Sequence, residues 1–358
     1  LSPTRELASQ IADSFVAYGK FLRLSVATVF GGVPIARQIR QLQAGVDILV
    51  ATPGRLLDLI DQRALNLRSV EIFVLDEADQ MLDLGFIHAL KRIDALLPKK
   101  RQSLFFSATM PKTIAELGDR FLTDPVKVSV APQSTTAERV EQFATFVNQS
   151  EKSALLAMKL RSEPIDRALV FTRTKHGADR VVKNLDAAGI RSAAIHGNKS
   201  QPQREKALAA FRTGEIRILV ATDIAARGID VGGVSHVFNF ELPNVPEQYV
   251  HRIGRTARAG ATGIAMAFVA DDEKAYMRQI EKLTRVKMEM LALPEDFVAV
   301  KAKIPQAPPS AARRHDEGRG GPREQRHGAG PDQQKRRFPP RRTKGVGTHR
   351  GAVQKTGR

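Results

Sequence analysis

The sequence predicts an α/β fold built on parallel sheets, and two observations support this. Short apolar runs rich in Val, Ile, Leu or Phe recur along residues 1 to 270, each followed at once by a polar or Gly-containing cluster. A helix-length amphipathic stretch then precedes the next apolar run. A buried parallel strand reads as a continuous apolar run, and a helical crossover returns the chain to the next parallel strand. We therefore expect strands and helices to alternate.

The predicted strands fall into two sets. The first set is 47–50, 72–75 and 104–106, and the second is 168–171, 192–195 and 218–220. A polar stretch with a Pro and no periodicity, residues 131–136, lies between them. We therefore predict a first domain over residues 1–131 and a second over 132–290. One large doubly wound domain is the alternative, because a linker signal of this kind is weak by itself.

The C-terminal segment has a different composition. Residues 301 to 358 carry 16 Lys/Arg against 4 Asp/Glu, a net of +12 out of +18 for the whole chain. The segment has few apolar residues and cannot bury enough surface to offset chain entropy. We predict a disordered basic tail over residues 291–358. Such a tail serves either contact with RNA or simple solubility.

Composition limits the remaining classes. The 358 residues suffice for about two domains. The chain has no Cys, which excludes disulfides and thiolate metal sites, and no apolar run approaches the roughly 20 residues of a membrane span. The start at Leu1 has neither a signal-peptide pattern nor an initiator Met. We expect a cytoplasmic protein whose first residue is a truncation point.

The run Asp76-Glu77-Ala78-Asp79 follows a predicted strand, so its first carboxylate is expected at the strand tip. Mg²⁺ held there through water could bridge phosphate oxygens, and Glu77 could orient or deprotonate an attacking water. A solvated acidic turn is the alternative for these four residues alone.

A second cluster is basic. His251, Arg255 and Arg258 stand at relative positions 0, 4 and 7, and would share one face if the segment were helical. Such a row could present guanidinium groups to a phosphate, or could be a basic helix surface paired with acids. Upstream, residues 221–230 end in Gly228, which permits close backbone approach, and Asp230, which suits a ribose hydroxyl.

Together these motifs resemble, in order, those of DEAD-box ATP-dependent RNA helicases of superfamily 2. The matching runs are 3–8, 31–32, 52–55, 76–79, 107–109, 170–172, 221–230 and 251–258. The resemblance covers residues 1 to 290, and Asp79 in place of His separates the chain from DEAH relatives. It implies two RecA-like parallel-sheet domains, the first one incomplete. The basic tail resembles that of a bacterial subgroup.

The resemblance also implies ATP and Mg²⁺ as cofactors. Asp76 would hold Mg²⁺ through water, Glu77 would act on the attacking water, and Ser107 and Thr109 would couple nucleotide state to domain closure. Gly228 and Asp230 would contact the nucleotide, Arg255 and Arg258 would act as arginine fingers, and His251 would link the acidic motif to the second domain. Ordinary strand-end capping is the alternative for Ser107 and Thr109.

RNA is the partner that the resemblance implies, bound without sequence preference because phosphates and 2′-hydroxyls carry no base identity. The implied contacts are Pro3, Thr4, Arg5, Gly32, Thr52 and Arg55 in the first domain and Arg173, Gly197, Arg204 and Thr222 in the second. ATP and single-stranded RNA would jointly close the domains and locally unwind a short duplex. Ribonucleoprotein or RNA-decay partners would bind through the tail.

The sequence departs from the family at its beginning. The family carries an upstream phosphate loop, G-x-x-x-x-G-K-[ST], and no such run stands in this sequence. The family also places the strand that carries this loop inside the first sheet. Its absence is expected to leave inner strand edges of that sheet unpaired. A smaller departure is Ala257, where Gly is frequent in the family. Two function classes follow: an incomplete copy of an RNA-stimulated ATPase and helicase, weak or inactive alone, or a catalytically inactive RNA-binding fragment.

Overall fold

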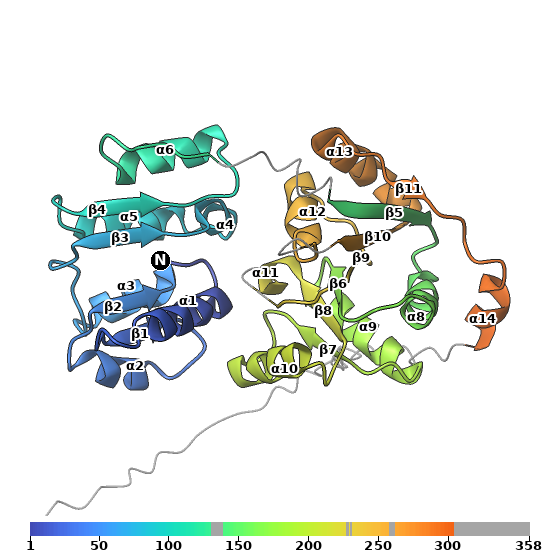
Figure 1. Ribbon diagram of the computed structural model, residues 1–358, viewed down its shortest axis with the longest axis horizontal. Helices are drawn as coiled ribbons and strands as arrows, with labels where there is room; N and C mark the ends of the chain where they lie inside the picture. Colours follow the sequence, from blue (N-terminus) through green and yellow to red (C-terminus); the bar gives the residue numbers. More distant parts are fainter. Residues whose placement is uncertain (130–138, 227–228, 230, 258–261, 304–358) are drawn as a thin grey trace, which may run out of the picture. The chain divides into compact units, whose positions relative to one another are not determined.

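Strands and helices alternate through the chain, as the apolar runs predict. The computed structural model describes residues 1–129, 139–226, 229, 231–257 and 262–303. Every strand pairing that it describes is parallel. Figure 1 shows the elements in order along the chain. The predicted α/β class with parallel sheets is confirmed, while the predicted boundary at residues 131 and 132 lies outside the described residues.

Residues 1–129 form two pairs of strands with helical crossovers. Their elements are α1 (Arg5–Tyr18), β1 (Val26–Val29), α2 (Ile35–Leu42), β2 (Ile48–Ala51), α3 (Pro53–Asp61), β3 (Ile72–Leu75), α4 (Ala78–Asp83), α5 (Ile87–Leu96), β4 (Gln102–Phe105) and α6 (Lys112–Phe121). Strand β1 pairs with β2, and β3 pairs with β4. Leucines and aromatics of α3, α5 and α6 pack on these strands to form the core.

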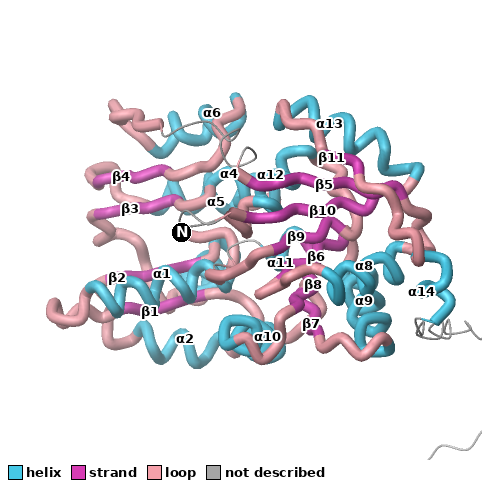
Figure 2. The backbone as a smooth tube through the Cα atoms, turned by 45° about the vertical axis from the view of Figure 1, so that its right-hand side comes forward, coloured by secondary structure: helices cyan, strands magenta, loops and turns pink. Residues whose placement is uncertain are grey.

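Leu1 and Ser2 connect the two strand pairs. The Ser2 amide donates to the carbonyl of Ala51 at the end of β2 (3.0 Å), and the Asp76 amide after β3 donates to the carbonyl of Leu1 (3.1 Å). The start of the chain therefore lies between β2 and β3 (Figure 2). The rest of the facing β2 and β3 edges carries no strand partner among the described residues, as expected from the sequence.

Residues 139–303 form one seven-stranded sheet. Its elements are β5 (Val140–Phe146), α8 (Lys152–Ser162), β6 (Ala168–Thr172), α9 (Lys175–Ala187), β7 (Ser192–Ile195), α10 (Gln201–Thr213), β8 (Ile218–Thr222), α11 (Asp223–Ala226), β9 (His236–Asn239), α12 (Pro246–Ile253), β10 (Gly263–Val269), the 3-10 helix η1 (Asp271–Glu273), α13 (Lys274–Thr284), β11 (Glu289–Met290) and α14 (Phe297–Lys303). The strand order is β11-β5-β10-β9-β6-β8-β7.

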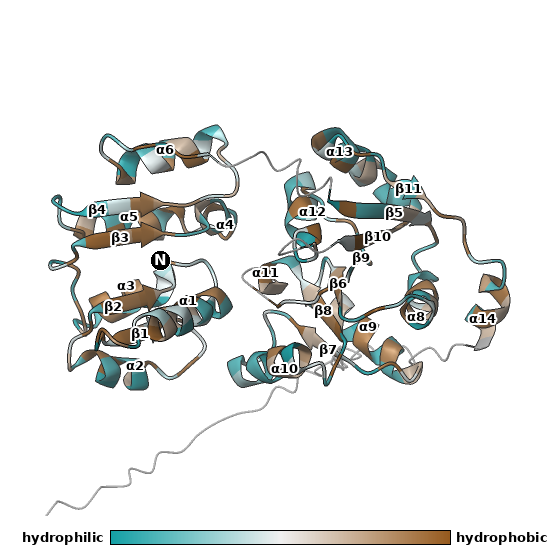
Figure 3. Cartoon of the chain, in the orientation of Figure 1, coloured by the Kyte–Doolittle hydropathy of each residue, from teal (hydrophilic) through white to brown (hydrophobic). Residues whose placement is uncertain are grey.

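Both faces of this sheet are covered, which explains why its strands β6 and β8 read as apolar runs. In β6, Val170 packs with α8 and α9 on one face, whereas Leu169 and Phe171 pack with α10 on the other. All five β6 residues are buried. In Figure 3 the central strands are brown and the helices are mixed, as expected for helices that cover a buried sheet.

The predicted start of the disordered tail at residue 291 is too early. Residues 297–303 form α14, whose Phe297 is buried in the core cluster of the large sheet. Lys301 of this helix pairs with Glu151 at 2.5 Å. Phe297 and Val300 pack on the core, and one ion pair adds to this contact, so the short helix is held against the sheet. The composition of the whole segment does not reveal this. Residues 304–358 lie outside the described part.

None of the helices described in the structure is long and apolar enough to cross a membrane.

A fully buried ion pair fastens α8 to η1. Lys152 and Glu273 are both inaccessible to solvent, and Lys152 Nζ donates to the Glu273 carboxylate and to the carbonyl of Phe240 (3.0 Å). Glu273 also accepts from the amides of Leu242 (3.1 Å) and Ala270 (3.0 Å). Burial lowers the pKa of Lys152, and the charge of Glu273 opposes that shift. The pair is thus satisfied on both sides, as a buried pair must be.

We predict that Glu273→Gln lowers the free energy of unfolding by about 3–5 kcal/mol, because it leaves the Lys152 charge buried without a counter-charge. Urea titration measures this. Asp61→Asn, which breaks the exposed pair with Arg92, is the control and should leave stability nearly unchanged. Equal losses in the two variants would contradict the prediction.

Candidate functional site

The predicted site residues gather at the carboxyl ends of the strands. Thr52, Asp76 and Ser107 follow β2, β3 and β4, and Arg173, Gly197 and Thr222 lie at or just after the ends of β6, β7 and β8 (Figure 1). Parallel strands place these ends at one edge of each sheet, which is where ligands bind in open α/β folds.

Asp76 and Glu77 form a tight turn at the end of β3. The Glu77 amide donates to Asp76 Oδ1 at 2.9 Å. Burial raises the pKa of Asp76, and that amide partly opposes the shift. Glu77 has φ 53 and ψ 51, a left-handed conformation that is strained for a residue other than Gly. The turn therefore holds two carboxylates in a conformation that the backbone alone disfavours.

Asp76 fits a cation that brings its own ligands. A nearby positive charge would stabilise the ionised form of its half-buried carboxyl group. No group of three or more His, Asp or Glu side chains forms a metal cage within the described ranges. Mg²⁺ suits such a site, because it keeps several waters and takes one or two carboxylates.

Asp79 connects this turn to the segment after β4. Its Oδ2 accepts from both the amide and the hydroxyl of Thr109, each at 2.9 Å. The Asp79 amide donates to Ser107 Oγ at 3.3 Å, and Ser107 Oγ donates to the carbonyl of Thr109 at 2.7 Å. In the sequence, Asp79 only separates the chain from DEAH relatives. Its carboxylate is in fact the acceptor that joins Ser107 and Thr109 to the acidic turn.

Gly32 makes room for Arg5. It has φ 79, and a Cβ at this position would lie 1.9 Å from Arg5 Nη1. Gly is therefore required both by the backbone conformation and by the guanidinium that covers it. Nothing lies within 4 Å of a Cβ built on Gly54, so close packing does not require Gly there.

Three predicted RNA contacts in residues 1–129 are buried. These are Pro3, Thr4 and Thr52. Thr4 caps α1, since its Oγ1 accepts from the Leu7 amide at 3.3 Å. The Thr52 carbonyl accepts from the Leu56 amide at the start of α3. Arg55 is largely buried too, and it donates to the carbonyl of Val33 at 3.1 Å.

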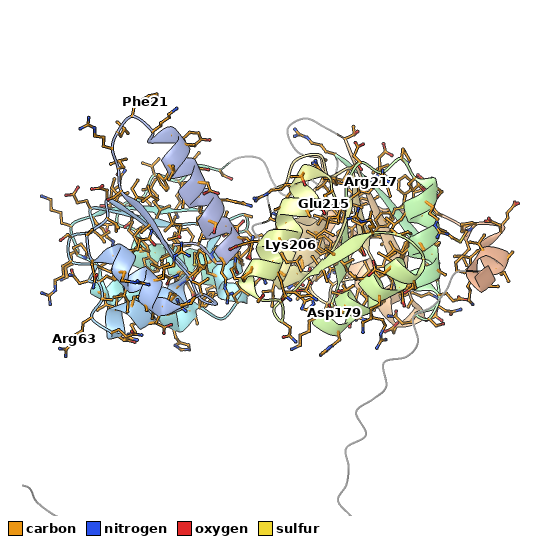
Figure 4. All side chains as sticks on the ribbon, turned by 90° about the horizontal axis from the view of Figure 1, so that it is seen from below. Phe21, Arg63, Asp179, Lys206, Glu215 and Arg217 are labelled. Atoms are coloured by element: carbon orange, nitrogen blue, oxygen red, sulfur yellow. The ribbon has the colours of Figure 1, made fainter. Side chains whose placement is uncertain are left out.

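Of the predicted contacts in the large sheet, Arg173 and Gly197 follow β6 and β7, Thr222 ends β8, and Arg204 lies in α10. The Arg173 amide donates to Glu241 Oε2 (2.8 Å), and its side chain lies 3.6 Å from Glu273. Gly197 is exposed and Thr222 half-buried, while Arg204 is buried and donates to the carbonyl of His196 (3.4 Å). His196 Nε2 is 3.0 Å from Asp179, which is labelled in Figure 4.

A pocket at this edge contains the basic motif. It is lined by Phe171, Asp223, Ala226, Gln248, His251, Arg252 and Arg255. The predicted helical face is wrong for Arg255, because α12 ends at Ile253 with Gly254 as its cap. Arg255 instead folds back, with Nε donating to the carbonyl of His251 (3.1 Å) and Nη1 to that of Ile229 (3.2 Å). His251 and Arg255 still meet in one pocket.

Arg252 is the residue of this motif that the sequence analysis misses. It is 1% exposed and binds Asp223 through Nε (2.5 Å) and Nη2 (2.8 Å). Its Nη1 donates to Asn239 Oδ1 (3.1 Å) and to the carbonyl of Glu241 (2.6 Å). These bonds fix α12 against the ends of β8 and β9. Arg252 is recognised as important only from the structure, because its charge is buried between two helices and two strand ends. The spacing of residues in the motif does not show this burial.

The departure at Ala257 has a backbone explanation. Ala257 has φ 53, in the left-handed region where Gly is favoured. Ala accepts the same conformation at a modest energetic cost. Gly228, Asp230 and Arg258, the other predicted nucleotide contacts, lie outside the described residues.

Two family models match the chain. The model of the DEAD/DEAH box helicase matches residues 1–117, and the model of the helicase conserved C-terminal domain matches residues 151–260. The chain is 44% identical over 294 residues to the DEAD-box ATP-dependent RNA helicase CshA of Bacillus subtilis, covering 82% of this chain and 60% of that protein. It is also 44% identical over 296 residues to the ATP-dependent RNA helicase CshA of Listeria monocytogenes, covering 82% and 56%. The chain thus spans 60% or less of the length of these two relatives.

A solved structure gives the same result for the fold. S. cerevisiae Dbp5 bound to RNA and ADP BeF3 matches with a TM-score of 0.74 and 29% identity, covering 85% of this chain and 79% of that chain.

Proposed function

Because the chain belongs to the DEAD-box family of helicases, we propose that it is the motor part of an ATP-dependent RNA helicase that locally unwinds RNA duplexes. The observation that carries the proposal is the joined acidic turn: Asp79 holds Ser107 and Thr109 against the loop of Asp76 and Glu77. A change at either carboxylate would therefore be transmitted to the segment after β4. Closure of the two RecA-like domains on ATP and RNA is the further step that we propose.

For hydrolysis we assign each role to a residue of this chain. Asp76 would hold Mg²⁺, whose charge would stabilise the phosphate oxygens, and Glu77 would orient the attacking water and accept its proton. Arg255 and Arg258 stabilise negative charge on the phosphate, and His251 links the acidic turn to their pocket. Gly228 and Asp230 contact the nucleotide. Bound ATP with Mg²⁺ supplies the phosphoanhydride bond whose hydrolysis resets the open state.

For RNA we propose contacts to the backbone only. Arg5 beside Gly32, together with Arg55, supplies cationic groups next to loop amides in residues 1–129. On the large sheet Arg173 supplies a cationic group, and Gly197 and Thr222 supply a backbone amide and a hydroxyl. Arg204 is buried, so its role is to hold the loop after β7 through the carbonyl of His196. Pro3, Thr4 and Thr52 are buried, so we limit their role to shaping the loops that face RNA. Phosphates and 2′-hydroxyls carry no base identity, and binding is therefore independent of sequence.

RNA binding without hydrolysis is the alternative function. Steady-state ATPase assays with and without RNA, together with RNA titrations, separate the two. RNA binding with no RNA-stimulated turnover, in a form of the protein that includes a phosphate loop, would favour the alternative.

In a form of the protein that includes a phosphate loop, we predict that Glu77→Gln and Arg255→Ala have different defects. Glu77→Gln should keep ATP and RNA binding but hold the closed state, so RNA release slows. Arg255→Ala should lower the hydrolysis rate by about 10³-fold, as removal of an arginine finger generally does. Arg191→Ala, at an exposed side chain of the same sheet, is the control and should hydrolyse normally. A normal hydrolysis rate in Glu77→Gln would remove the role assigned to that carboxylate.

We predict that Gly32→Ala weakens RNA binding by about tenfold, the effect of one lost charge-assisted contact. The added Cβ would force Arg5 away from the loop. Gly45→Ala is the matched control, because Gly45 also has a positive φ (77) but nothing lies within 4 Å of its Cβ. Urea titration should show similar destabilisation of both variants. Fluorescence anisotropy with labelled single-stranded RNA should show a binding defect only for Gly32→Ala, and equal binding of both variants would refute the Arg5 contact.

We predict that the basic segment 301–358 is an electrostatic tether that raises RNA affinity without adding sequence preference. Its net charge is +12, and Phe338 is its only aromatic residue, so phosphate contact outweighs base stacking. Each phosphate neutralised on a single strand adds roughly 0.7 to the slope of log affinity against log salt. Removal of residues 304–358, which leaves α14 and the Lys301–Glu151 pair in place, should therefore flatten the slope for two unrelated RNA sequences. Equal slopes would leave solubility as the role of the tail.

A cytoplasmic location and ribonucleoprotein or RNA-decay partners that bind through the tail stay predictions of the sequence.

A further inference from the structure

The loop from Phe30 to Val33, which carries Gly31 and Gly32, is held at both ends by one pair of side chains. Gln38 of α2 donates from Nε2 to the carbonyl of Phe30 at 3.0 Å. Arg55 of α3 donates from Nη1 to the carbonyl of Val33 at 3.1 Å. Arg55 Nη1 also donates to Gln38 Oε1 at 2.9 Å. These hydrogen bonds close a ring around the loop.

Gln38 is suited to this ring because an amide donates and accepts at the same time. Its exposed fraction is only 4%, whereas its neighbours Arg37 and Arg40 on the same helix are exposed. A buried carboxylate could not donate to the Phe30 carbonyl, and an apolar side chain could bond neither partner. Position 38 therefore requires an amide because of its two hydrogen bonds, not because of the volume of the side chain.

Gln38 also determines what Arg55 does. The Arg55 guanidinium is planar, so two oxygen acceptors on Nη1 fix the direction of its remaining nitrogens. Asp58, one turn further along α3 and 61% exposed, lies 3.6 Å from Arg55 Nε and competes for the same charge. Without Gln38, Asp58 would draw the guanidinium toward itself and neutralise it.

We infer that Gln38 is a positioning residue for RNA binding: it holds Arg55 and the Gly31–Gly32 backbone in the arrangement that receives an RNA phosphate. The inference rests on the proposed function. It concerns a residue outside the motifs that carry the family resemblance, and it requires no contact between Gln38 and RNA.

The test is Gln38→Met in the full 358-residue chain, because Met matches the length of Gln and removes both hydrogen bonds. Anisotropy titrations with a labelled oligouridine at several salt concentrations should show about tenfold weaker binding. The salt slope should fall by roughly 0.7 if one phosphate contact is lost. Gln142→Met is the matched control, since Gln142 is also buried (6% exposed) and accepts from the Tyr249 hydroxyl on the other sheet (3.0 Å). Its RNA affinity and slope should not change.

Two further variants separate positioning from general destabilisation. Adding Asp58→Asn to Gln38→Met should restore part of the affinity, because the competing carboxylate is gone. Arg55→Ala should bind weakly, and adding Gln38→Met to it should cause a smaller loss than Gln38→Met causes alone, since only the bond to the Phe30 carbonyl is then left to remove.

Each other outcome decides against the inference. Normal RNA binding by Gln38→Met beside weak binding by Arg55→Ala overturns it and leaves the proposed function intact. Equal losses in Gln38→Met and Gln142→Met also overturn it, because they indicate general destabilisation. Unchanged binding by Arg55→Ala shows instead that this RNA surface is wrong, and the inference fails with it.

Discussion

Parallel strand pairing is the constraint on which the rest of this structure depends. A parallel strand cannot be followed by a tight hairpin, so each strand requires a crossover that returns the chain to the same starting edge. All loops that follow strands therefore leave from one edge of each sheet. Asp79 and Ser107 meet for this reason, although they are far apart in the sequence, and Arg173, His196 and Thr222 lie at one edge of the large sheet. The topology therefore brings the loops after the strands to one edge, whichever side chains those loops carry.

Buried polar side chains then convert neighbouring loops into fixed sites. Asp79 bonds the segment after β4, and Arg252 bonds Asp223 and the end of β9. Gln38 plays the same part for the loop that contains Gly32. Each of these residues is almost inaccessible, so each must satisfy its polar atoms within the protein. The loops are held because an unsatisfied buried group costs more free energy than an ordered loop.

The sequence predicts several strands at their observed bounds and misses others whose polar residues are buried. The runs at Ile72–Leu75 and Ser192–Ile195 predict β3 and β7 at their observed bounds. Strand β5 is not predicted, because Gln142 and Thr145 interrupt its apolar pattern although both side chains are buried. Local composition cannot reveal that neighbouring strands cover these positions.

Site prediction has the same limit. Asp76, Ser107 and His251 follow from strand ends and motif order, because local spacing encodes them. Arg252 does not follow from local spacing, because its role depends on a hydrogen bond to Asp223, which lies 29 positions away in the sequence. The helical face predicted for Arg255 fails for a related reason, since Gly254 ends the helix one residue earlier.

The arginines proposed to meet phosphate already have protein acceptors. Arg55 bonds a carbonyl and an amide oxygen, and Arg255 bonds two carbonyls. A guanidinium has several N–H donors in a fixed plane, so it can keep a protein acceptor while it donates to a ligand. The protein acceptor restricts the rotamers of a long side chain before the ligand arrives, which reduces the entropy lost on binding. The buried hydrogen bonds around these arginines are therefore part of the binding site, and a substitution that removes one of them should weaken binding without touching the ligand.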